Sequence, residues 1–479
     1  MRRWTPFAFA VTFAWVAAAT EWFVDDVTGR DDADGRSPES AWRSLGKVNA
    51  AELAPGDEVR FRSGGIWRGQ LRPQSGSLGR SITYGSYGKG PKPVLMGSVS
   101  AVGATAWLEV APGRWRSTVA GLVRDVGQVV CADGRTWGVK KFSRDELKTP
   151  LDYWYDENDH SVLLRSDVNP GLSFSSLELA LSRHIIDETR CHDVVYDGLA
   201  LRYGAAHGIG GATVSNVVVR ACDISWIGGG LQRWVLDGKS GRRHPCRWGN
   251  GVEFGSNCRN ALVERCRIWE IYDTAVTCQS GAVDDSDENV VFRDNVLWHA
   301  EYSFEFWNVN PRSRSSGIVF EHNTCVGAGF GWGHRQRPNP NGTHLMFFQN
   351  RALAENVVVR NNVFCRASER AVTLVNDWLA PPGSSEGLRL ERNLYWVDGE
   401  NVFEGNAKGQ KGLCFGPYGF ADYVARLGID RDSVCARPEF IDEESHDYRL
   451  RPGSVGSSMA TDRSPVGARF VDDCRRTEK

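Results

Sequence analysis

The sequence has almost no excess charge of either sign, since 57 lysines and arginines nearly balance 59 aspartates and glutamates, for a formal net charge of -2. Proteins that track nucleic acid through its phosphates usually carry a basic domain or stripe. The chain also lacks the phosphate-binding pattern G-x-x-x-x-G-K-[ST] and the elbow G-x-S-x-G, and GIGG at 208–211 lacks the spacing of a dinucleotide loop. Nucleic acid partners, nucleotide-dependent enzymes and α/β serine hydrolases are therefore not indicated.

Patterns typical of metal sites are missing as well. The twelve cysteines include no C-x-x-C pair and the ten histidines are scattered, so we expect no zinc site. The acidic run DDSDEN at 284–289 is a calcium candidate, but it lacks the glycine and the closing glutamate of an EF-hand loop. We interpret it as a solvated turn. We expect no cofactor, with calcium as the open alternative.

A long apolar run occurs only at the N-terminus. MRRWTPFAFAVTFAWVAAAT has two arginines, an apolar stretch from Trp4 to Ala19 and small residues at its end. This is typical of a secretory signal peptide (1–19) cleaved after Ala19, with a retained anchor as the alternative. No later run approaches the ~18 apolar residues of a membrane-spanning helix. We expect a secreted, periplasmic or extracellular monomer without a membrane span, in a compartment where disulfides are allowed.

The middle of the chain is built from repeats. Nine-residue segments such as NVVVRACDI and NVVVRNNVF align without gaps. They start at Asp193, Asn216, Asn260, Asn289, Gly317, Asn356 and Gly387. Each unit holds short alternating strands broken by turns, without a helical stripe. Because one such unit cannot bury its apolar face alone, the pattern predicts units stacked around a continuous core, as in a parallel β-helix.

The seventh residue of the units predicts a ladder of side chains. In order these residues are Leu199, Cys222, Cys266, Asn295, Asn323, Asn362 and Asn393. Asparagines stacked at a strand spacing of ~4.8 Å would hydrogen-bond one to the next. The two cysteines take the same slot in neighbouring units, which leaves a disulfide or two free thiols as alternatives.

These segments resemble the right-handed parallel β-helix proteins of the pectate-lyase-like superfamily, many of which act on polysaccharides. The start, FVDDVTGRDDADGRSPESAWRSLGKVNAAELAPGDEVRFRSGGIWRG, looks like the entry coils of secreted members. GIDRDSVCARPEFIDEESHDYRLRPGS is similar to their closing segment. The resemblance implies an all-β fold, a right-handed parallel β-helix, and a carbohydrate-active enzyme.

The same features predict how the chain is divided. We expect an N-terminal cap and entry coils over 20–100, a β-rich inserted subdomain over 101–190, central coils over 191–404, and C-terminal coils, cap and tail over 405–479. A capping helix is expected over 37–50, with Ser37 as its N-cap. DYWYDENDHSVLLRS predicts a hairpin around Asp156 to His160, and FADYVARLG predicts a short helix.

A third strand follows each ladder turn and carries the candidate acids. If Val252, Val276, Phe304, Leu345 and Val372 point inward, then Glu253, Thr277, Glu305, Met346 and Thr373 form one outward column. The two glutamates are two coils apart, so their backbones should lie roughly 9 to 10 Å apart. Inverting glycosidases keep their carboxyls about 6.5 to 9.5 Å apart, whereas retaining enzymes need about 5 to 5.5 Å. Glu253 and Glu305 are therefore the candidate acid and base, with Asp273 as a third carboxylate able to replace either.

Two long insertions, 226–250 and 327–343, precede third strands and should wall a cleft over this column. Sugars stack their C–H faces on aromatic rings and pair their hydroxyls with planar polar groups. The candidate substrate-binding residues of the insertions and neighbouring strands are Trp248, His299, Trp307, Trp332, His334, Arg337 and His344. Each tryptophan taken alone is better explained by packing against its own loop, but their clustering is not expected from packing alone.

Three functions follow, all with a polysaccharide or oligosaccharide as partner. The first is an inverting glycoside hydrolase using the glutamate pair. The second is a polysaccharide lyase or C5-epimerase of a uronic acid polymer, in which His334, Arg337, His344 or Arg247 would serve as base or neutralise the substrate carboxylate. The third is a non-catalytic glycan-binding β-helix.

Overall fold

The computed structural model describes residues 19–238, 241–350, 353–376, 387–397 and 401–470. The signal peptide expected over 1–19, except Ala19, and the tail expected from 471 lie outside these residues. Within them, no helix is long and apolar enough to cross a membrane.

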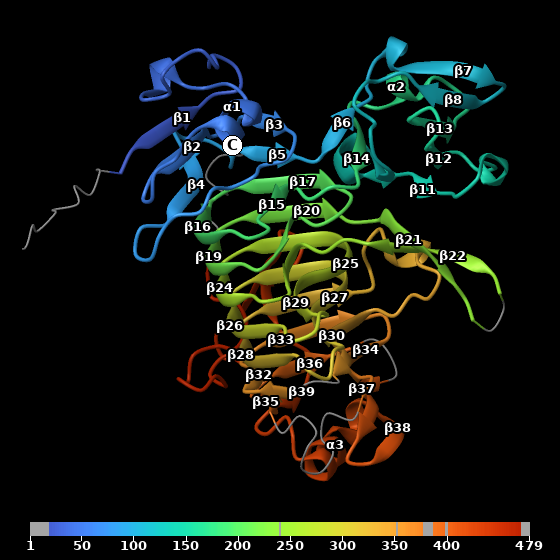
Figure 1. The fold of residues 1–479 in the computed structure, drawn as a ribbon. Coiled ribbons are helices and arrows are strands. Elements are labelled where there is room, and N and C mark those ends of the chain that lie inside the picture. Colours follow the sequence, from blue (N-terminus) through green and yellow to red (C-terminus); the bar gives the residue numbers. More distant parts are fainter. Residues whose placement is uncertain (1–18, 239–240, 351–352, 377–386, 398–400, 471–479) are drawn as a thin grey trace, which may run out of the picture.

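Parallel strands from successive repeats stack along one long axis (Figure 1). The first strand of each coil forms one sheet with equivalent residues in register, as in Val217, Ala261, Val290 and Ile318. In spatial order the sheet contains β1 (Glu21–Val24), β2 (Glu58–Arg62), β4 (Ile82–Tyr87), β16 (His192–Asp197), β19 (Ser215–Arg220), β24 (Arg259–Glu264), β26 (Ser286–Arg293), β28 (Arg314–Glu321), β32 (Val357–Arg360) and β35 (Leu388–Glu391), with β31 (Leu353–Glu355) beside β28. The fold is a right-handed parallel β-helix, as the sequence predicts.

The second and third strands of the coils form the other long sheet, also parallel over most of its length. Its second strands are β3 (Ile66–Arg68), β5 (Val94–Met96), β17 (Ala200–Gly204), β20 (Asp223–Ile227), β29 (Thr324–Ala328), β33 (Val363–Ala367), β36 (Leu394–Trp396) and β39 (Val434–Cys435). Its third strands are β15 (Ile186–Asp187), β18 (Ile209–Ala212), β23 (Val252–Gly255), β30 (Thr343–Asn350), β34 (Arg370–Leu374) and β37 (Asn401–Ala407), the last paired antiparallel with β38 (Gln410–Phe415). In β25 (Arg267–Ser280) and β27 (Val296–Asn308) the two are continuous. These third strands position the candidate acids.

The core lies inside the coils and obeys the predicted alternation. Val252, Val276, Phe304, Leu345 and Val372 have no exposed surface and belong to one continuous cluster. Burying a side chain of this size stabilises the fold by about 1.5 to 3 kcal/mol relative to leaving it exposed. The inward parity of the third strands is therefore set by apolar burial, and the residues between them are turned outward.

The asparagine ladder is confirmed. The Nδ2 groups of Asn295, Asn323 and Asn362 donate to the Oδ1 atoms of Asn323, Asn362 and Asn393, at 3.0, 3.2 and 3.0 Å. Cys222 and Cys266 are adjacent in the same slot, but both are free thiols, so the disulfide alternative is wrong. Their sulfurs instead donate to backbone oxygens, Cys222 to Arg220 and Cys266 to Glu264.

The expected N-terminal capping helix is not confirmed. Ser37 caps only the short 3-10 helix η1 (Pro38–Ser40), and a separate helix, α1 (Leu45–Ala50), begins after the N-cap Ser44. The buried Trp42 stands between them in an isolated bridge with Val24, which interrupts the helix. The predicted helix near the other end is confirmed as α3 (Phe420–Leu427), ended by Gly428 in a left-handed conformation.

Residues 98–181 form two sheets beside the N-terminal coils, antiparallel except where β11 pairs with β12 in parallel (Figure 1). One contains β6 (Ser98–Ser100), β14 (Leu177–Leu181), β9 (Val126–Cys131) and β10 (Thr136–Trp137); the other contains β11 (Val139–Lys140), β12 (Asp152–Asp156), β13 (Ser161–Arg165), β8 (Arg114–Ser117) and β7 (Trp107–Ala111). They share their own apolar cluster. The hairpin predicted around Asp156 to His160 is confirmed by the pairing of β12 with β13. The predicted boundaries of the subdomain stay a prediction.

Candidate functional site

The candidate acids stand in register on the third strands. Glu253 of β23 pairs with Thr277 of β25, which pairs with Glu305 of β27. The column continues through Met346 and Thr373 to Glu404. At the usual strand spacing the backbones of Glu253 and Glu305 are roughly 9 to 10 Å apart.

The column is covered rather than open to solvent, contrary to the expectation from sequence. Glu305 is 8% exposed, and Thr277 and Met346 are 0% and 1% exposed, although none of them points into the core. The side chains of Glu253 and Asp273 keep 19% and 22% of their surface exposed. The acids therefore sit in a partly dry environment where electrostatic interactions are strong.

The two insertions lie on the same side of the β-helix, as predicted. The first forms the hairpin of β21 (Gly230–Leu236) and β22 (Arg243–Trp248), and the second contains the 3-10 helix η5 (His334–Gln336). Trp226 stacks on Trp332 with ring centroids 6.2 Å apart, and the Arg247 guanidinium donates to Gln336 Oε1 at 3.3 Å. These contacts join the insertions into one cover.

Glu253 is held by Asn250 and lies beside His207. Its Oε2 accepts from Asn250 Nδ2 at 2.5 Å, and it lies 3.2 Å from His207 Nε2 without a hydrogen bond between these two atoms. Because His207 Nδ1 accepts the backbone N–H of Asn250 at 2.9 Å, we assign the ring proton to Nε2, facing the glutamate. His184 stacks on His207 at 4.8 Å, and Trp248 packs edge-on against it at 4.6 Å. Asn250 fixes one carboxylate oxygen, and among the described residues no hydrogen bond is made to the other, Oε1.

Asp273 belongs to a chain of ion pairs that runs into the second insertion. Its carboxylate lies 3.1 Å from Arg337, which also lies 3.6 Å from Glu301. Glu301 in turn accepts from His334 Nδ1 at 2.9 Å. The Arg337 guanidinium packs over the rings of Tyr272 and Tyr302. Burial lowers the pKa of Arg337, but the charges of Asp273 and Glu301 outweigh burial and the pKa is raised. The cation is thus fixed beside Asp273.

Glu305 has an amide donor but, among the described residues, no ion-pair partner. Gln279 Nε2 donates to Glu305 Oε2 at 3.0 Å, and Trp307 follows Gln279 in register on the outer face. Burial, then the charges of Asp273 and Glu253, raise the pKa of Glu305 well above its usual value. Its carboxyl therefore carries the proton when the neighbouring carboxylates are ionised.

The three carboxyl groups titrate as a set. Burial raises the pKa of Glu253 to about 7, partly opposed by the Asn250 hydrogen bond. Burial also raises the pKa of Asp273, with the Arg337 charge acting in the opposite direction and Glu301 adding to the rise. Groups that resist ionising together are suited to hold one proton and one free base near neutral pH.

Several predicted residues lie away from this set. His299 binds Glu270 at 2.8 Å, and Glu270 accepts the Trp332 backbone N–H, so this pair holds the second insertion in place. Trp332 is 4% exposed between Trp226 and Tyr272. His344 is fully buried, binds Ser303 and packs against the core residue Phe364, because β30 turns it inward. Neither Trp332 nor His344 presents a face to a sugar here.

The acidic run at 284–289 is only partly a solvated turn. Asp285 accepts the backbone N–H groups of Gly281 and Ala282, and Asp287 accepts that of Cys258. Both carboxyls are buried, which raises the pKa of Asp287 to about 7. Among the described residues, no group of three or more His, Cys, Asp or Glu side chains is placed to hold a metal ion.

Sequence reasoning missed His184, His207 and Asn250. A signal was present, because these residues stand three positions before Asp187, Gly210 and Glu253, which are in register in successive coils. Aligning the third strands from this earlier position would have shown polar side chains stacked beside the acid. It would also have shown Gly210, whose lack of a side chain leaves room where the histidines pack.

No protein-family model matches the sequence, and no curated protein matches it. Solved structures do resemble it. A structure named as a glycoside hydrolase covers 86% of this chain and 99% of its own, at 10% identity and a TM-score of 0.47. Pectate lyase Pel9A covers 96% and 98%, at 10% identity and a TM-score of 0.47. The GH136 lacto-N-biosidase from Eubacterium ramulus covers 87% and 68%, at 12% identity and a TM-score of 0.39.

The chain has a parallel β-helix fold, which the register of its stacked strands shows. The fold does not determine the reaction, which depends on the side chains of the covered column.

Proposed function

We propose that this protein is a glycoside hydrolase that cleaves a polysaccharide or oligosaccharide with inversion. The observation that carries the proposal is the set of Glu253, Asp273 and Glu305, three coupled carboxyl groups under a shared cover. The roughly 9 to 10 Å between the glutamate backbones suits the ~6.5 to 9.5 Å carboxyl separation of inverting enzymes, with room for a water.

The electrostatics suggest the roles. Glu305, whose pKa is raised well above its usual value, keeps a proton and acts as general acid toward the glycosidic oxygen. Glu253, with a pKa of about 7, acts as general base, because Oε2 is held by Asn250 while Oε1 can take a proton from water. Asp273, paired with Arg337, supplies the negative charge that keeps the proton on Glu305 and stabilises positive charge developing on the sugar.

The basic groups needed by a lyase are engaged elsewhere. Arg337 is paired with Asp273 and Glu301, and Arg247 donates to the backbone oxygens of Gly229 and Gly127. His344 is buried in the core. These three groups are therefore not free to neutralise a uronate carboxylate, which favours hydrolysis over elimination.

Mass spectrometry of products from a broad glycan panel tests this proposal. Hydrolysis adds one water to the summed mass of the fragments, whereas elimination adds none and produces absorbance near 232 nm. We expect the gain of water for at least one glycan. Fragments without added water, or binding of a glycan without any cleavage, would contradict the proposal.

The pH dependence of activity should respond to Asn250. Its hydrogen bond favours the ionised form of Glu253, so Asn250→Ala should raise the pKa of this base. The acidic limb of the kcat/KM profile, expected near pH 7, should move upward by about one pH unit, given ~1.5 kcal/mol for a charged hydrogen bond. Asn341→Ala is the control, because its amide oxygen accepts from Arg370 instead. A limb that stays or moves down would remove Glu253 from the role of base.

A further inference from the structure

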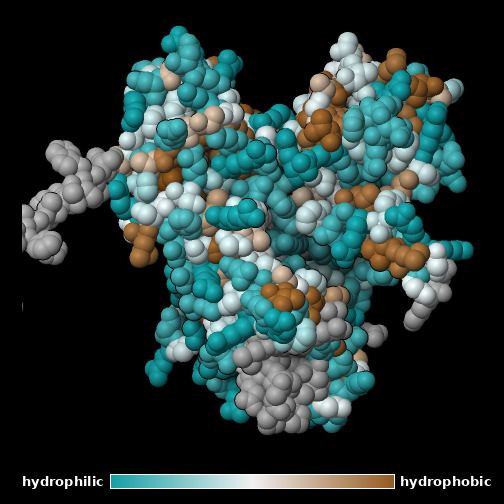
Figure 2. Space-filling model, in the orientation of Figure 1, coloured by the Kyte–Doolittle hydropathy of each residue, from teal (hydrophilic) through white to brown (hydrophobic). Residues whose placement is uncertain are grey.

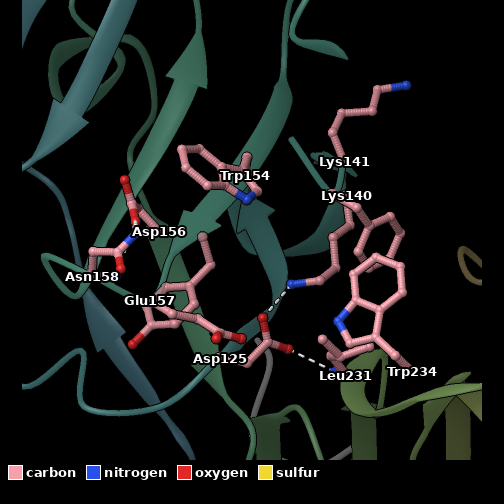
Figure 3. Close-up of a pocket in the computed structure, with 11 residues that line it drawn as sticks. Asp125, Lys140, Lys141, Trp154, Asp156, Glu157, Asn158, Leu231 and Trp234 are labelled. Carbon is pink, nitrogen blue, oxygen red and sulfur yellow. Dashed lines mark hydrogen bonds and ion pairs between the residues drawn. The ribbon is translucent and has the colours of Figure 1, made fainter. Parts of the chain in front are cut away.

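A hollow away from the carboxylates lies where the inserted sheets meet the β21–β22 hairpin (Figure 3). Its volume is about 240 Å³. Drug-sized ligands occupy pockets of about 300 to 1,000 Å³, so this space suits one or two small rings. Neither Glu253 nor Glu305 lines it. Figure 2 shows hydrophobic residues over the inserted sheets and near the hairpin, among several hydrophobic patches on a largely hydrophilic face.

A buried ion pair fixes the two walls of the hollow. Lys140 Nζ lies 2.5 Å from Asp125 Oδ1 and donates to the backbone oxygen of Val126. The other oxygen of Asp125 accepts the backbone N–H of Leu231 in the hairpin, at 2.7 Å. Figure 3 shows the contacts of Asp125 with Lys140 and with Leu231. The site is therefore built before any ligand arrives, which reduces the ordering cost of binding.

Aromatic rings reach the hollow from separate segments. Trp154 belongs to β12 and Trp234 to β21, and Figure 3 shows them on different sides of the space. Trp234 is 38% exposed, yet its ring is held edge-on by Phe142 at 5.6 Å. Trp154 is half-buried and Trp234 is exposed, so both can present a ring to the hollow. Indoles that converge from distant parts of a chain form a stacking surface for a flat apolar face, such as the C–H face of a sugar.

The polar lining is acidic. Lys140 is neutralised by Asp125, and Lys141 lies 3.2 Å from Asp152. Asp156 and Glu157 also line the hollow, and neither has an ion-pair partner within the described ranges. Carboxylate oxygens accept hydrogen bonds from hydroxyl groups, and the Asn158 amide lies beside them at the turn. The remaining negative charge disfavours a ligand that is itself an anion.

We propose that this hollow is a carbohydrate-binding subsite, separate from the carboxylate column. It binds an uncharged sugar ring, which stacks between Trp154 and Trp234. The carboxylates of Asp156 and Glu157 accept hydrogen bonds from its hydroxyl groups, and the amide of Asn158 donates to them or accepts from them. The choice of a sugar as ligand rests on the proposed function, whereas the hollow and its charge do not. The subsite would hold a distant part of the chain whose cleavage occurs at the column.

Titration calorimetry with defined hexasaccharides tests the subsite. The background is the double variant Glu253→Gln with Glu305→Gln, so that no probe is consumed. The neutral probes are xylohexaose, cellohexaose and mannohexaose, and the anionic probe is hexagalacturonate. We expect at least one neutral probe to bind, and Trp154→Ala and Trp234→Ala each to weaken that binding at least tenfold. Tyr418→Ala is the matched control, since it removes a fully exposed aromatic ring at the other end of the molecule.

The outcomes separate this inference from the proposed function. Binding that is lost when Trp234→Ala is added to this background, together with a parent protein that cleaves none of the glycans, would sustain the subsite and overturn the hydrolase. Cleavage together with unchanged binding in both tryptophan variants would do the reverse. The subsite is also overturned if no neutral hexasaccharide binds, or if hexagalacturonate is the probe whose binding depends on Trp154. Trp234 is exposed, so loss of its ring should leave the thermal unfolding temperature unchanged and folding intact.

Discussion

Replacing Glu305 or Glu253 by glutamine should lower kcat on the cleaved glycan by roughly 10²- to 10⁴-fold, the contribution of one positioned acid or base. Glutamine keeps the shape of the side chain, so Gln279 and Asn250 retain a neighbouring carbonyl oxygen. It removes the proton from the acid and the basic oxygen from the base. KM should change little, because neither exchange removes a ring or a hydrogen-bonding surface from the substrate path.

Glu404→Gln is the matched control for both variants. Glu404 stands in the same outward column, beyond Thr373, but its side chain is 40% exposed and pairs with Arg370 at 2.9 Å. Its removal should leave kcat within about twofold of the parent. Equal losses in all three variants would indicate a general effect of charge, and unchanged turnover in Glu253→Gln and Glu305→Gln would remove both residues from the reaction.

Stability should fall as the pH rises through 8, because of a carboxyl group inside the β-helix. Glu188 is fully buried, and burial raises its pKa from 4.5 to about 8, with the charge of Asp187 adding to the rise and the Tyr196 hydroxyl partly opposing it. The protonated form contributes stability that is fully present below pH 4.5 and is lost as pH rises through 8. The loss should be on the order of 3 to 5 kcal/mol in the free energy of unfolding.

Glu188→Gln should abolish this dependence. Urea unfolding at pH 4.5 and at pH 9 should show the variant gaining those 3 to 5 kcal/mol relative to the parent at the higher pH. The comparison with the parent is needed because Glu253 and Asp287, with pKa values of about 7, also titrate in this range. Glu52→Gln, at an exposed position, should behave as the parent does. An identical pH profile in the Glu188 variant would show that this carboxyl is ionised in the folded protein throughout.

Much of the fold could be predicted from short-range periodicity in the sequence. Val252, Val276 and Phe304 are buried at equivalent positions of successive third strands, and the next residue of each strand points the opposite way. The placement of Glu253 and Glu305 in one outward column could therefore be predicted from this alternation alone. The ladder of asparagines could be predicted for the same reason, since one slot recurs in every coil.

Contacts between distant segments could not be read in the same way. The cover over the column depends on the inserted sheets, where the Gln128 amide donates to the backbone oxygens of Trp226 and Gly228, and Arg247 donates to Gly127. No period links these residues, because irregular loops dock through individual hydrogen bonds. The inward turn of His344 and the burial of Asp287 follow from such local packing, and both were mistaken for exposed features.

The stereochemistry of the first product tests the central claim most directly. Proton NMR recorded during early turnover, before the anomers equilibrate, reports the configuration of the newly formed reducing end. A water activated by Glu253 across the sugar from Glu305 predicts a product of inverted configuration. A retained anomer would place the nucleophile on the enzyme, and an unsaturated, non-reducing end would replace hydrolysis by elimination; either result would contradict the account.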